Sequence, residues 1–470
     1  MGRLKIGLVG GSYVQRSLPF DAQRSVNLYP ISDQDGAEIA SLQGTAGLSL
    51  FTSISSGGIR NGFYSGKGRA FFVSGAALYE IDEIGMKTFR GNLGTSTGNI
   101  SMAEDINSLA ICDGTKLYSL EYSSNNFTSI SATGLPSSVG YVSNIDGYFV
   151  VNENNTGRFH ISAINDVSSW GSLDFATAES EPDNLVCAIN AIGQLWLMGT
   201  KTTEIWANTG ASTFPFGRIA GAVMQVGISS AHSAIEIDNT LMWVGLDEYG
   251  ESIVYRASGF TPQRVSNSMI ERRIQEAGEK EEIKAWAYQE DGHLFYILTG
   301  GGLETSLAYD LTTGLWHERA YLNTDGNFEQ HLGSCHIYAF GKHLVGDRRN
   351  GNIYELSLSY YSDNGDEIAR ERTYTHIIDE GRRIRYNALE IGFETGVGLQ
   401  TGQGSNPLVS LQLSQDGART WSNWITKSIG KVGKYQTKVV FRRLGIAEQM
   451  TFKIRITDPV KVNITGSYLS

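Results

Sequence analysis

The sequence predicts an all-β fold, a β-propeller of about six to seven blades followed by a C-terminal β-sandwich-like domain. A short β-hairpin pattern repeats along residues 62–356, and a strand-only repeat of about 40 to 50 residues is typical of propeller blades. The chain has 55 glycines and 8 prolines, and glycine supplies the positive-φ positions of tight turns. After about residue 360 the strands become longer and alternate strictly, which indicates a second domain.

Each repeat consists of an apolar strand, a tight turn, and a second strand that ends in an aromatic or aliphatic cluster. The second hairpin, for example, turns at Asp113 and Gly114, a dipeptide that favours two-residue hairpins. Several strands are continuously apolar, as expected for strands buried between stacked blades. The closing clusters lie at residues 78–81, 117–120, 158–161, 203–206, 252–255, 307–309 and 352–356.

Residues 1–55 precede the repeat and contain two strand-like stretches, at 25–30 and 45–51. The segment is too short to fold alone. We therefore expect an extended N-terminal segment that packs on the propeller or on a neighbouring chain.

One stretch within the repeat has helical periodicity. Ile270, Ile274 and Ala277 share one face, and Ser268 can cap the start. The pattern predicts a short helix near residues 268–283, which either covers one end of the propeller or serves as a docking element.

The propeller is assigned to residues 56–360 and a C-terminal antiparallel β domain to residues 361–470. A period of two indicates antiparallel strands with one face in water. The alternative is that these strands complete the propeller as its last blade. The alternating strands lie at residues 385–393, 408–414, 437–442, 450–456 and 460–468.

Charge, cysteine spacing and apolar runs argue against a DNA-gripping, disulfide-bonded, secreted or membrane-inserted protein. The net charge of −11 argues against a protein that mainly grips DNA phosphates, but it is compatible with passage of DNA. Cys112, Cys187 and Cys335 are widely separated and are expected to be reduced core residues. The N-terminus lacks a signal-peptide pattern and no long apolar run is present, so we expect synthesis in a cytosol and no membrane insertion.

No catalytic, cofactor-binding or metal-binding pattern stands out. Glycines at residues 7–11 lack the spacing and βαβ context of a dinucleotide loop. His317, His331, His336 and His343 lack the close spacing of metal ligands and are expected to be ordinary core and surface residues. We therefore predict no cofactor and no enzyme activity.

Residues 414–421 resemble the Asp-box turn of sialidases and other propellers. Ala418 stands where that motif has a glycine. The motif is a structural turn in which the aspartate satisfies loop amides, and a glycosidase would also need two convergent carboxylates. The stretch therefore predicts a hairpin turn rather than hydrolysis.

Two groups of residues are candidate interface contacts. Basic clusters lie at 348–349, 370–372, 382–385 and 442–443; they are either solvated strand edges or contacts to an acidic partner or DNA phosphates. An aromatic group on the loop after the fourth hairpin is either an apolar face between copies or a cap between blades. The candidates are Trp206, Phe214, Phe216, Arg382, Arg383 and Arg385.

Six stretches of the chain have a recognisable pattern: residues 25–30, 44–48, 192–206, 209–211, 411–421 and 452–468. Together they resemble the packaged-DNA stabilisation, or tail nozzle, proteins of short-tailed bacteriophages (podoviruses). The resemblance spans most of the chain, with one departure at Ala46, where the family usually has proline.

The resemblance implies a structural virion protein of the phage tail that forms a homo-hexamer below the portal and its adaptor ring. It further implies contacts with tailspikes or fibres and with a needle or plug protein, retention of packaged DNA, and non-specific passage of double-stranded DNA during ejection. Two alternatives remain from the residues themselves. One is a carbohydrate-active, sialidase-like propeller of a phage tail, and the other is a monomeric propeller for protein docking.

Overall fold

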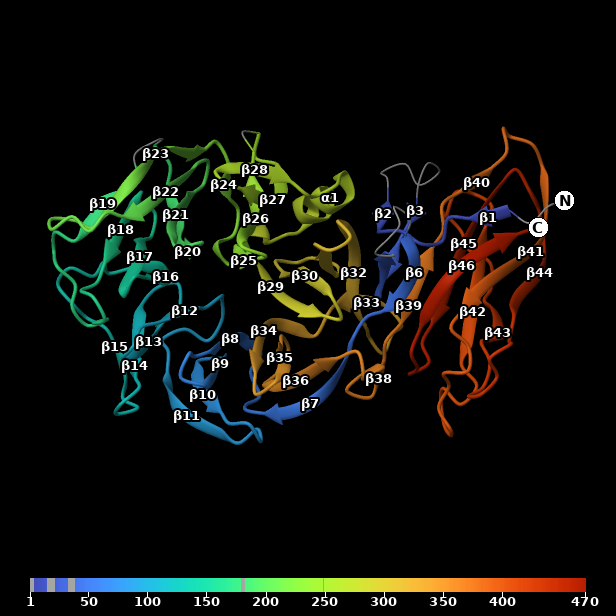
Figure 1. Cartoon of the computed structure of the whole chain (residues 1–470), viewed down its shortest axis with the longest axis horizontal. Coiled ribbons are helices and arrows are strands. Elements are labelled where there is room, and N and C mark those ends of the chain that lie inside the picture. The colour runs from blue at the N-terminus through green and yellow to red at the C-terminus, as the bar shows by residue number, and fades with distance from the viewer. Residues whose placement is uncertain (1–3, 15–21, 33–38, 179–181, 248) are drawn as a thin grey trace.

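The computed structural model describes residues 4–14, 22–32, 39–178, 182–247 and 249–470, and strands dominate it (Figure 1). A β-propeller forms one end of the elongated molecule and a β-sandwich forms the other (Figure 1). The chain is therefore all-β with two parts, as the repeat and the later period-two strands predict.

Seven blades of antiparallel strands make up the propeller within the described residues, and blades six and seven belong to larger sheets. Each predicted closing cluster lies in the third strand of a four-stranded blade, so the hairpin repeat predicts the order of the blades correctly. Blade five has one further short strand. The first three blades contain β8 (Ile59–Tyr64), β9 (Ala70–Ser74), β10 (Ala77–Ile81) and β11 (Lys87–Asn92); β12 (Ser101–Glu104), β13 (Ser108–Cys112), β14 (Leu117–Glu121) and β15 (Phe127–Ser129); and β16 (Val139–Ile145), β17 (Tyr148–Glu153), β18 (Arg158–Ile161) and β19 (Phe175–Thr177).

The remaining blades continue around the ring. They contain β20 (Leu185–Ala191), β21 (Gln194–Gly199), β22 (Thr203–Asn208) and β23 (Phe216–Met224); β24 (Gly227–Ile228), β25 (Ile235–Ile237), β26 (Thr240–Leu246), β27 (Ser252–Ser258) and β28 (Thr261–Arg264); β29 (Ile283–Glu290), β30 (His293–Gly300), β31 (Ser306–Asp310) and β32 (Leu315–Leu322), with β33 (Phe328–Gln330) beside β32; and β34 (Gly333–Ala339), β35 (Lys342–Asp347), β36 (Asn352–Ser357) and β7 (Gly47–Ser53).

Blade seven takes its outer strand from the N-terminal part of the chain. Strand β7 pairs antiparallel with β36, with Leu48 opposite Leu356, and the short β37 (Ser362–Asp363) pairs with its other edge. The repeat predicts residues 1–55 to lie outside the propeller, but this pairing places β7 inside a blade, because blade seven needs a fourth strand. The ring is thereby closed by a strand about 300 residues away in sequence.

Apolar clusters fill each of the seven contacts between neighbouring blades. Phe71 of blade one packs in a cluster with Ile111 of blade two, and Phe72 of blade one packs in another with Ile337 of blade seven. The five other clusters join the remaining neighbours in the same way. The continuously apolar strands are therefore buried on both faces.

Helix α1 (Ser268–Glu276) lies between blades five and six, and its buried Ile270 and Ile274 join the cluster there. Asn267, rather than the expected Ser268, caps it, since the Asn267 Oδ1 accepts hydrogen bonds from the Met269 and Ile270 amides at 3.0 and 3.1 Å. At nine residues, α1 is the longest helix described and falls far short of crossing a bilayer. The 3-10 turns are η1 (Ala231–Ser233) and η2 (Lys280–Glu282).

The C-terminal strands form a two-layered sandwich rather than the last propeller blade. Its apolar core includes Leu389 and Phe441 from one layer and Leu411 and Phe452 from the other, all buried. One layer contains β44 (Val439–Ala447), β41 (Ile384–Phe393), β46 (Asn463–Leu469), β6 (Ile39–Gly44), β5 (Leu28–Ser32) and β1 (Leu4–Ile6); the other contains β39 (Arg370–Thr373), β45 (Gln449–Ile456), β42 (Leu408–Ser414), β43 (Ile425–Ser428) and β40 (Ile377–Ile378). The remaining short strands are β2 (Tyr13–Val14), β3 (Ala22–Gln23), β4 (Ser25–Val26) and β38 (Asp366–Glu367).

Candidate functional site at the junction of propeller and sandwich

Strand β4 connects the propeller to the sandwich through backbone pairing. Val26 pairs in parallel with Glu318 of β32 and antiparallel with Glu371 of β39. Because β39 also pairs with β45, blade six and one sandwich layer form a single hydrogen-bonded sheet. Such a sheet resists bending at the junction, since bending would break backbone hydrogen bonds.

Asn27 fixes the turn directly after β4. Its backbone adopts a φ of 54°, a left-handed conformation that asparagine tolerates better than most residues. Its side-chain amide donates to the Ala320 and Ala369 carbonyls at 2.8 and 3.0 Å, and its Oδ1 accepts from the Ala320 amide at 2.9 Å. One side chain therefore links blade six to the start of the sandwich.

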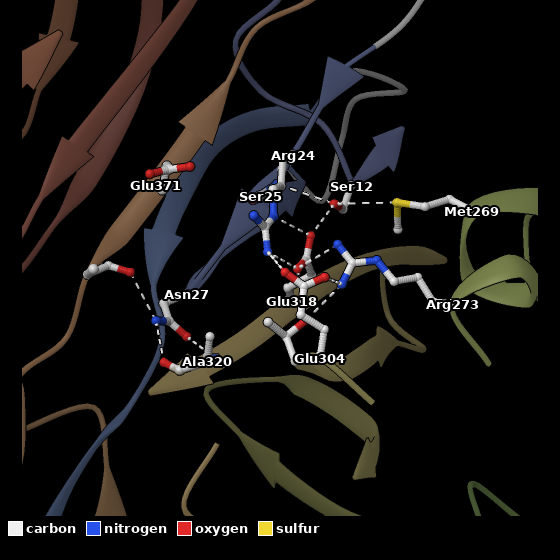
Figure 2. Close-up of polar contacts among 12 residues, drawn as sticks. Ser12, Arg24, Ser25, Asn27, Met269, Arg273, Glu304, Glu318, Ala320 and Glu371 are labelled. Carbon is white, nitrogen blue, oxygen red and sulfur yellow. Dashed lines mark hydrogen bonds and ion pairs between the residues drawn. The ribbon is translucent and has the colours of Figure 1, made fainter. Parts of the chain in front are cut away.

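A buried carboxylate, Glu318, lies at the centre of this junction (Figure 2). Arg24 from the N-terminal segment donates to both of its oxygens, at 2.9 and 2.8 Å. Arg273 of α1 and Thr305 approach Oε2 at 3.4 and 2.8 Å, and Ser12 donates to Oε1 at 3.3 Å. The carboxylate thus joins four separate segments of the chain.

The arginines keep Glu318 ionised. Burial raises the pKa of its carboxyl, but the charges of Arg24 and Arg273 and the hydrogen bonds from Arg24 and Thr305 outweigh burial and lower it to about 2. The pKa of Arg24 is raised, because the attraction and hydrogen bonds of Glu318 outweigh the lowering effect of burial. The pair therefore stays charged at neutral pH.

Strand β39 presents ionic groups on both of its faces. Glu371 accepts from Arg455 of β45 at 2.7 and 2.9 Å. The fully buried Arg372 faces the other way and donates to the carbonyls of Leu8 and Gly11 and to the Gln23 side chain at 2.8, 2.9 and 2.7 Å. Arg372 thereby holds the N-terminal segment against the sandwich.

These groups support a mechanical role for the site. Glu318 and Arg372 are saturated by partners from distant segments, so they lock elements together. Sequence reasoning missed Glu318, although a signal existed: Glu318 and Arg319 interrupt an otherwise largely apolar strand, and charged residues at such positions are paired when buried.

The structure places the predicted aromatic group between blades three and four. Trp206 and Phe214 are half-buried and pack edge-on against Phe159 at centroid distances of 5.3 and 5.8 Å. Phe216 is only 4% exposed and packs against Tyr148, so it fills the core between these blades, in agreement with the alternative of a cap between blades, and it is not available as an interface contact. An interface role for Trp206 and Phe214 stays a prediction.

The predicted arginines lie at the start of β41 and in the turn before it. Arg382, Arg383 and Arg385 are all exposed, and Arg382 donates to Glu380 at 2.6 Å. Their role in an interface also stays a prediction.

The four histidines lie in and around blades six and seven. His317 and His331 are buried, and the His336 Nε2 lies 3.0 Å from the His343 Nδ1. His336 also stacks on Trp286. Among the described residues, no group of three or more side chains is arranged to hold a metal ion.

The Asp-box-like stretch forms the predicted turn, in the sandwich. Asp416 accepts hydrogen bonds from the amides of Arg419 and Thr420 at 3.1 and 2.9 Å and from the Thr420 hydroxyl at 2.6 Å. These hydrogen bonds lower the pKa of Asp416. The carboxylate is thus occupied within its own turn.

Two family models match consecutive parts of the chain. The model described as bacteriophage P22 Gp10, beta-propeller, matches residues 4–361, and the model described as bacteriophage P22 Gp10, beta-sandwich, matches residues 369–470. The comparison with curated proteins returned no match.

Three solved structures are weakly similar to the chain. Each has a TM-score below 0.5, so none of them supports an argument about fold or function. The computationally designed Ika8 protein is 10% identical, with a TM-score of 0.40, over 66% of this chain and 100% of that chain. The Neurospora crassa Pan2 WD40 domain is 8% identical, with a TM-score of 0.44, over 66% and 95%. The N-terminal domain of Nup159 is 8% identical, with a TM-score of 0.41, over 71% and 98%.

Proposed function

The chain belongs to the bacteriophage P22 Gp10 family and is a structural component of the tail of a short-tailed phage, and from this premise we propose that six copies form a nozzle below the portal and its adaptor ring. The nozzle retains the packaged DNA and conducts it during ejection. The two family models together cover nearly the whole chain, which supports carrying the family's role over to it.

The observation that carries the proposal is the continuity of the body. Strand β7 closes the seven-bladed ring, and β4 continues blade six into the sandwich. The Glu318 and Arg372 contacts reinforce that junction. A part that withstands pressure from packaged DNA has to be stiff, and closed propellers with paired edges meet that need.

The partners follow from the same role. We propose contacts with the adaptor ring above, with tailspikes or fibres at the side, and with a needle or plug protein below. Ring contacts between copies are heterologous and close by rotation. Trp206 and Phe214 remain candidates for such contacts.

We propose no catalytic activity for the chain. The aspartate of the Asp-box-like turn is engaged by its own loop, and that turn lies in the sandwich rather than in a blade. We also propose the functional division into an N-terminal segment over 1–55, a propeller over 56–360 and a C-terminal domain over 361–470, with β7 of the N-terminal segment supplying a strand to blade seven.

Imaging of the assembled tail tests the proposal. We expect six copies of this chain around the DNA exit axis, in contact with the adaptor ring. The purified chain mixed with adaptor rings should give a mass increment of six copies per ring. A single copy, or copies away from the axis, would contradict the proposal.

A further inference from the structure

The charge of the chain is divided unequally between its two parts. Residues 369–470, the sandwich match, contain 15 lysines and arginines and 8 aspartates and glutamates, so their net charge is 15 − 8 = +7. The whole chain carries −11, so residues 1–368 carry −11 − 7 = −18. Residues 1–46, which include the sandwich strands β1, β5 and β6, contain four basic and four acidic side chains, so the −18 belongs to residues 47–368. A basic sandwich is thus attached to a strongly acidic propeller, and opposite charges attract each other.

Most of the basic side chains of the sandwich face water. Within residues 369–470, all of which the structure describes, the exposed acidic residues are Asp379, Glu380 and Glu448. The exposed basic residues are Arg382, Arg383, Arg385, Arg419, Lys427, Lys431, Lys434, Lys438, Arg442, Arg443 and Lys461. This surface therefore has a large excess of positive charge.

Six of these residues form what we call the basic stripe: Arg385, Lys431, Lys434, Lys438, Arg442 and Arg443. Strand β44 is the edge of its layer and carries Arg442 and Arg443, and the three lysines lie in the loop that leads into it. Arg385 lies on the neighbouring β41, opposite Ile446. Within the part of the chain that the structure describes, none of the six has a carboxylate at ion-pair distance.

Strands β41 and β44, which carry the three arginines of the stripe, lie at the end of the molecule away from the propeller (Figure 1). The arginines of the stripe therefore lie apart from the propeller of their own chain and, being exposed, are open to a second molecule.

Apolar side chains are interspersed with the stripe. Tyr435 is 73% exposed, Val432 39% and Ile446 47%. Interfaces with DNA are strongly polar and positive, whereas protein interfaces combine aromatic and apolar contacts with a charged rim. The mixture favours an acidic protein surface over DNA phosphates as the occupant.

We propose that the basic stripe of one copy docks on the acidic propeller of the next copy. This inference rests on the proposed ring, for which it names the contact. The contact is heterologous, so repetition around an axis leads to a closed ring. The net charge of the propeller makes it the complementary surface that is available wherever this protein assembles, and charge complementarity also fixes the orientation.

Charge reversal tests the contact. Lys438→Glu with Arg442→Glu changes the stripe, and Arg419→Glu with Lys427→Glu is the matched control, since both residues are exposed and lie outside it. Sedimentation of each full-length variant at low and high salt measures self-association. At low salt, we expect the stripe variant to self-associate at least about tenfold more weakly than the wild type. High salt should weaken the self-association of the wild type. Equal thermal unfolding midpoints show that folding is unaffected.

Zero-length carboxyl-to-amine coupling in a mixture of ¹⁴N and ¹⁵N protein identifies the partner surface. We expect mixed-isotope links from Lys431, Lys434 or Lys438 to propeller carboxylates. Tyr435→Ala provides a second variant without a charge change, and it should weaken association as well.

The outcomes separate the inference from the proposed function. A stripe variant that forms rings as well as the wild type overturns the inference alone. A wild-type chain that stays monomeric at low salt and adds no sixfold mass to adaptor rings overturns both. Loss of binding to duplex DNA by the stripe variant, with self-association unchanged, makes DNA the occupant and overturns the inference.

Discussion

Replacement of Glu318 by glutamine should weaken the junction between propeller and sandwich. The side chain is 0% exposed, and glutamine would leave Arg24 and Arg273 without their buried counter-charge. Breaking a buried ion pair by removing one partner costs about 3 to 5 kcal/mol. The pKa gives a similar value, because a shift from 4.5 to about 2 corresponds to about 3.5 kcal/mol at roughly 1.4 kcal/mol for each pH unit. We therefore expect Glu318→Gln to lower the free energy of unfolding by about 3 kcal/mol at pH 7.

The pH dependence has a definite sign. The pKa of Glu318 in the folded chain lies below the ordinary value of 4.5, so its carboxylate stabilises the fold fully above pH 4.5. That contribution is lost as the pH falls toward 2. The difference between wild type and Glu318→Gln should therefore shrink over this range.

Urea denaturation followed by tryptophan fluorescence measures the effect, with limited proteolysis of the junction as a second readout. Glu304→Gln is the matched control, since Glu304 also pairs with Arg273, at 2.8 Å, but its side chain is 60% exposed. We expect the control to cost less than about 1 kcal/mol. Equal costs for the two variants, or a difference that stays constant down to pH 2, would refute the reasoning.

Three further predictions concern the ring closure and the helix cap. Burial raises the pKa of Asp363 from 3.8 to about 7, so the stability of the wild type relative to Asp363→Asn should fall by about 4 kcal/mol as the pH rises from 4 to 8. Urea titrations of both proteins at several pH values measure this change, and a stability difference that does not vary with pH would contradict the prediction. Gly47→Ala should lower the unfolding temperature, because a Cβ would lie 2.6 Å from two backbone carbonyl oxygens, whereas Gly278→Ala meets nothing within 4 Å and should be neutral; similar calorimetric midpoints would rule this out. Asn267→Ala should lower the free energy of unfolding by about 1 kcal/mol, and Ser268→Ala should change it little. A larger loss for Ser268→Ala in urea denaturation would identify Ser268 as the cap instead.

The hairpin repeat could be predicted from the sequence because it depends on local signals. The Asp113-Gly114 turn and its flanking apolar strands lie within about a dozen residues, and turn chemistry with period two decides such a unit. The same local signals indicate the alternating strands of the sandwich. The aromatic residues were harder, because Phe216 looks the same in sequence whether it fills a core or faces a partner.

The chain by itself determined the blades and the existence of a second β domain, since neighbouring residues form each hairpin. Only the tertiary structure decided which strands close the ring and connect the two parts. Strand β7 pairs with a strand about 300 residues later, and β4 is two residues long, too short to give a periodic signal. The role of Glu318 depends on Arg24 and Arg273, far away in sequence, and the energy of a buried charge is set by which groups surround it in space.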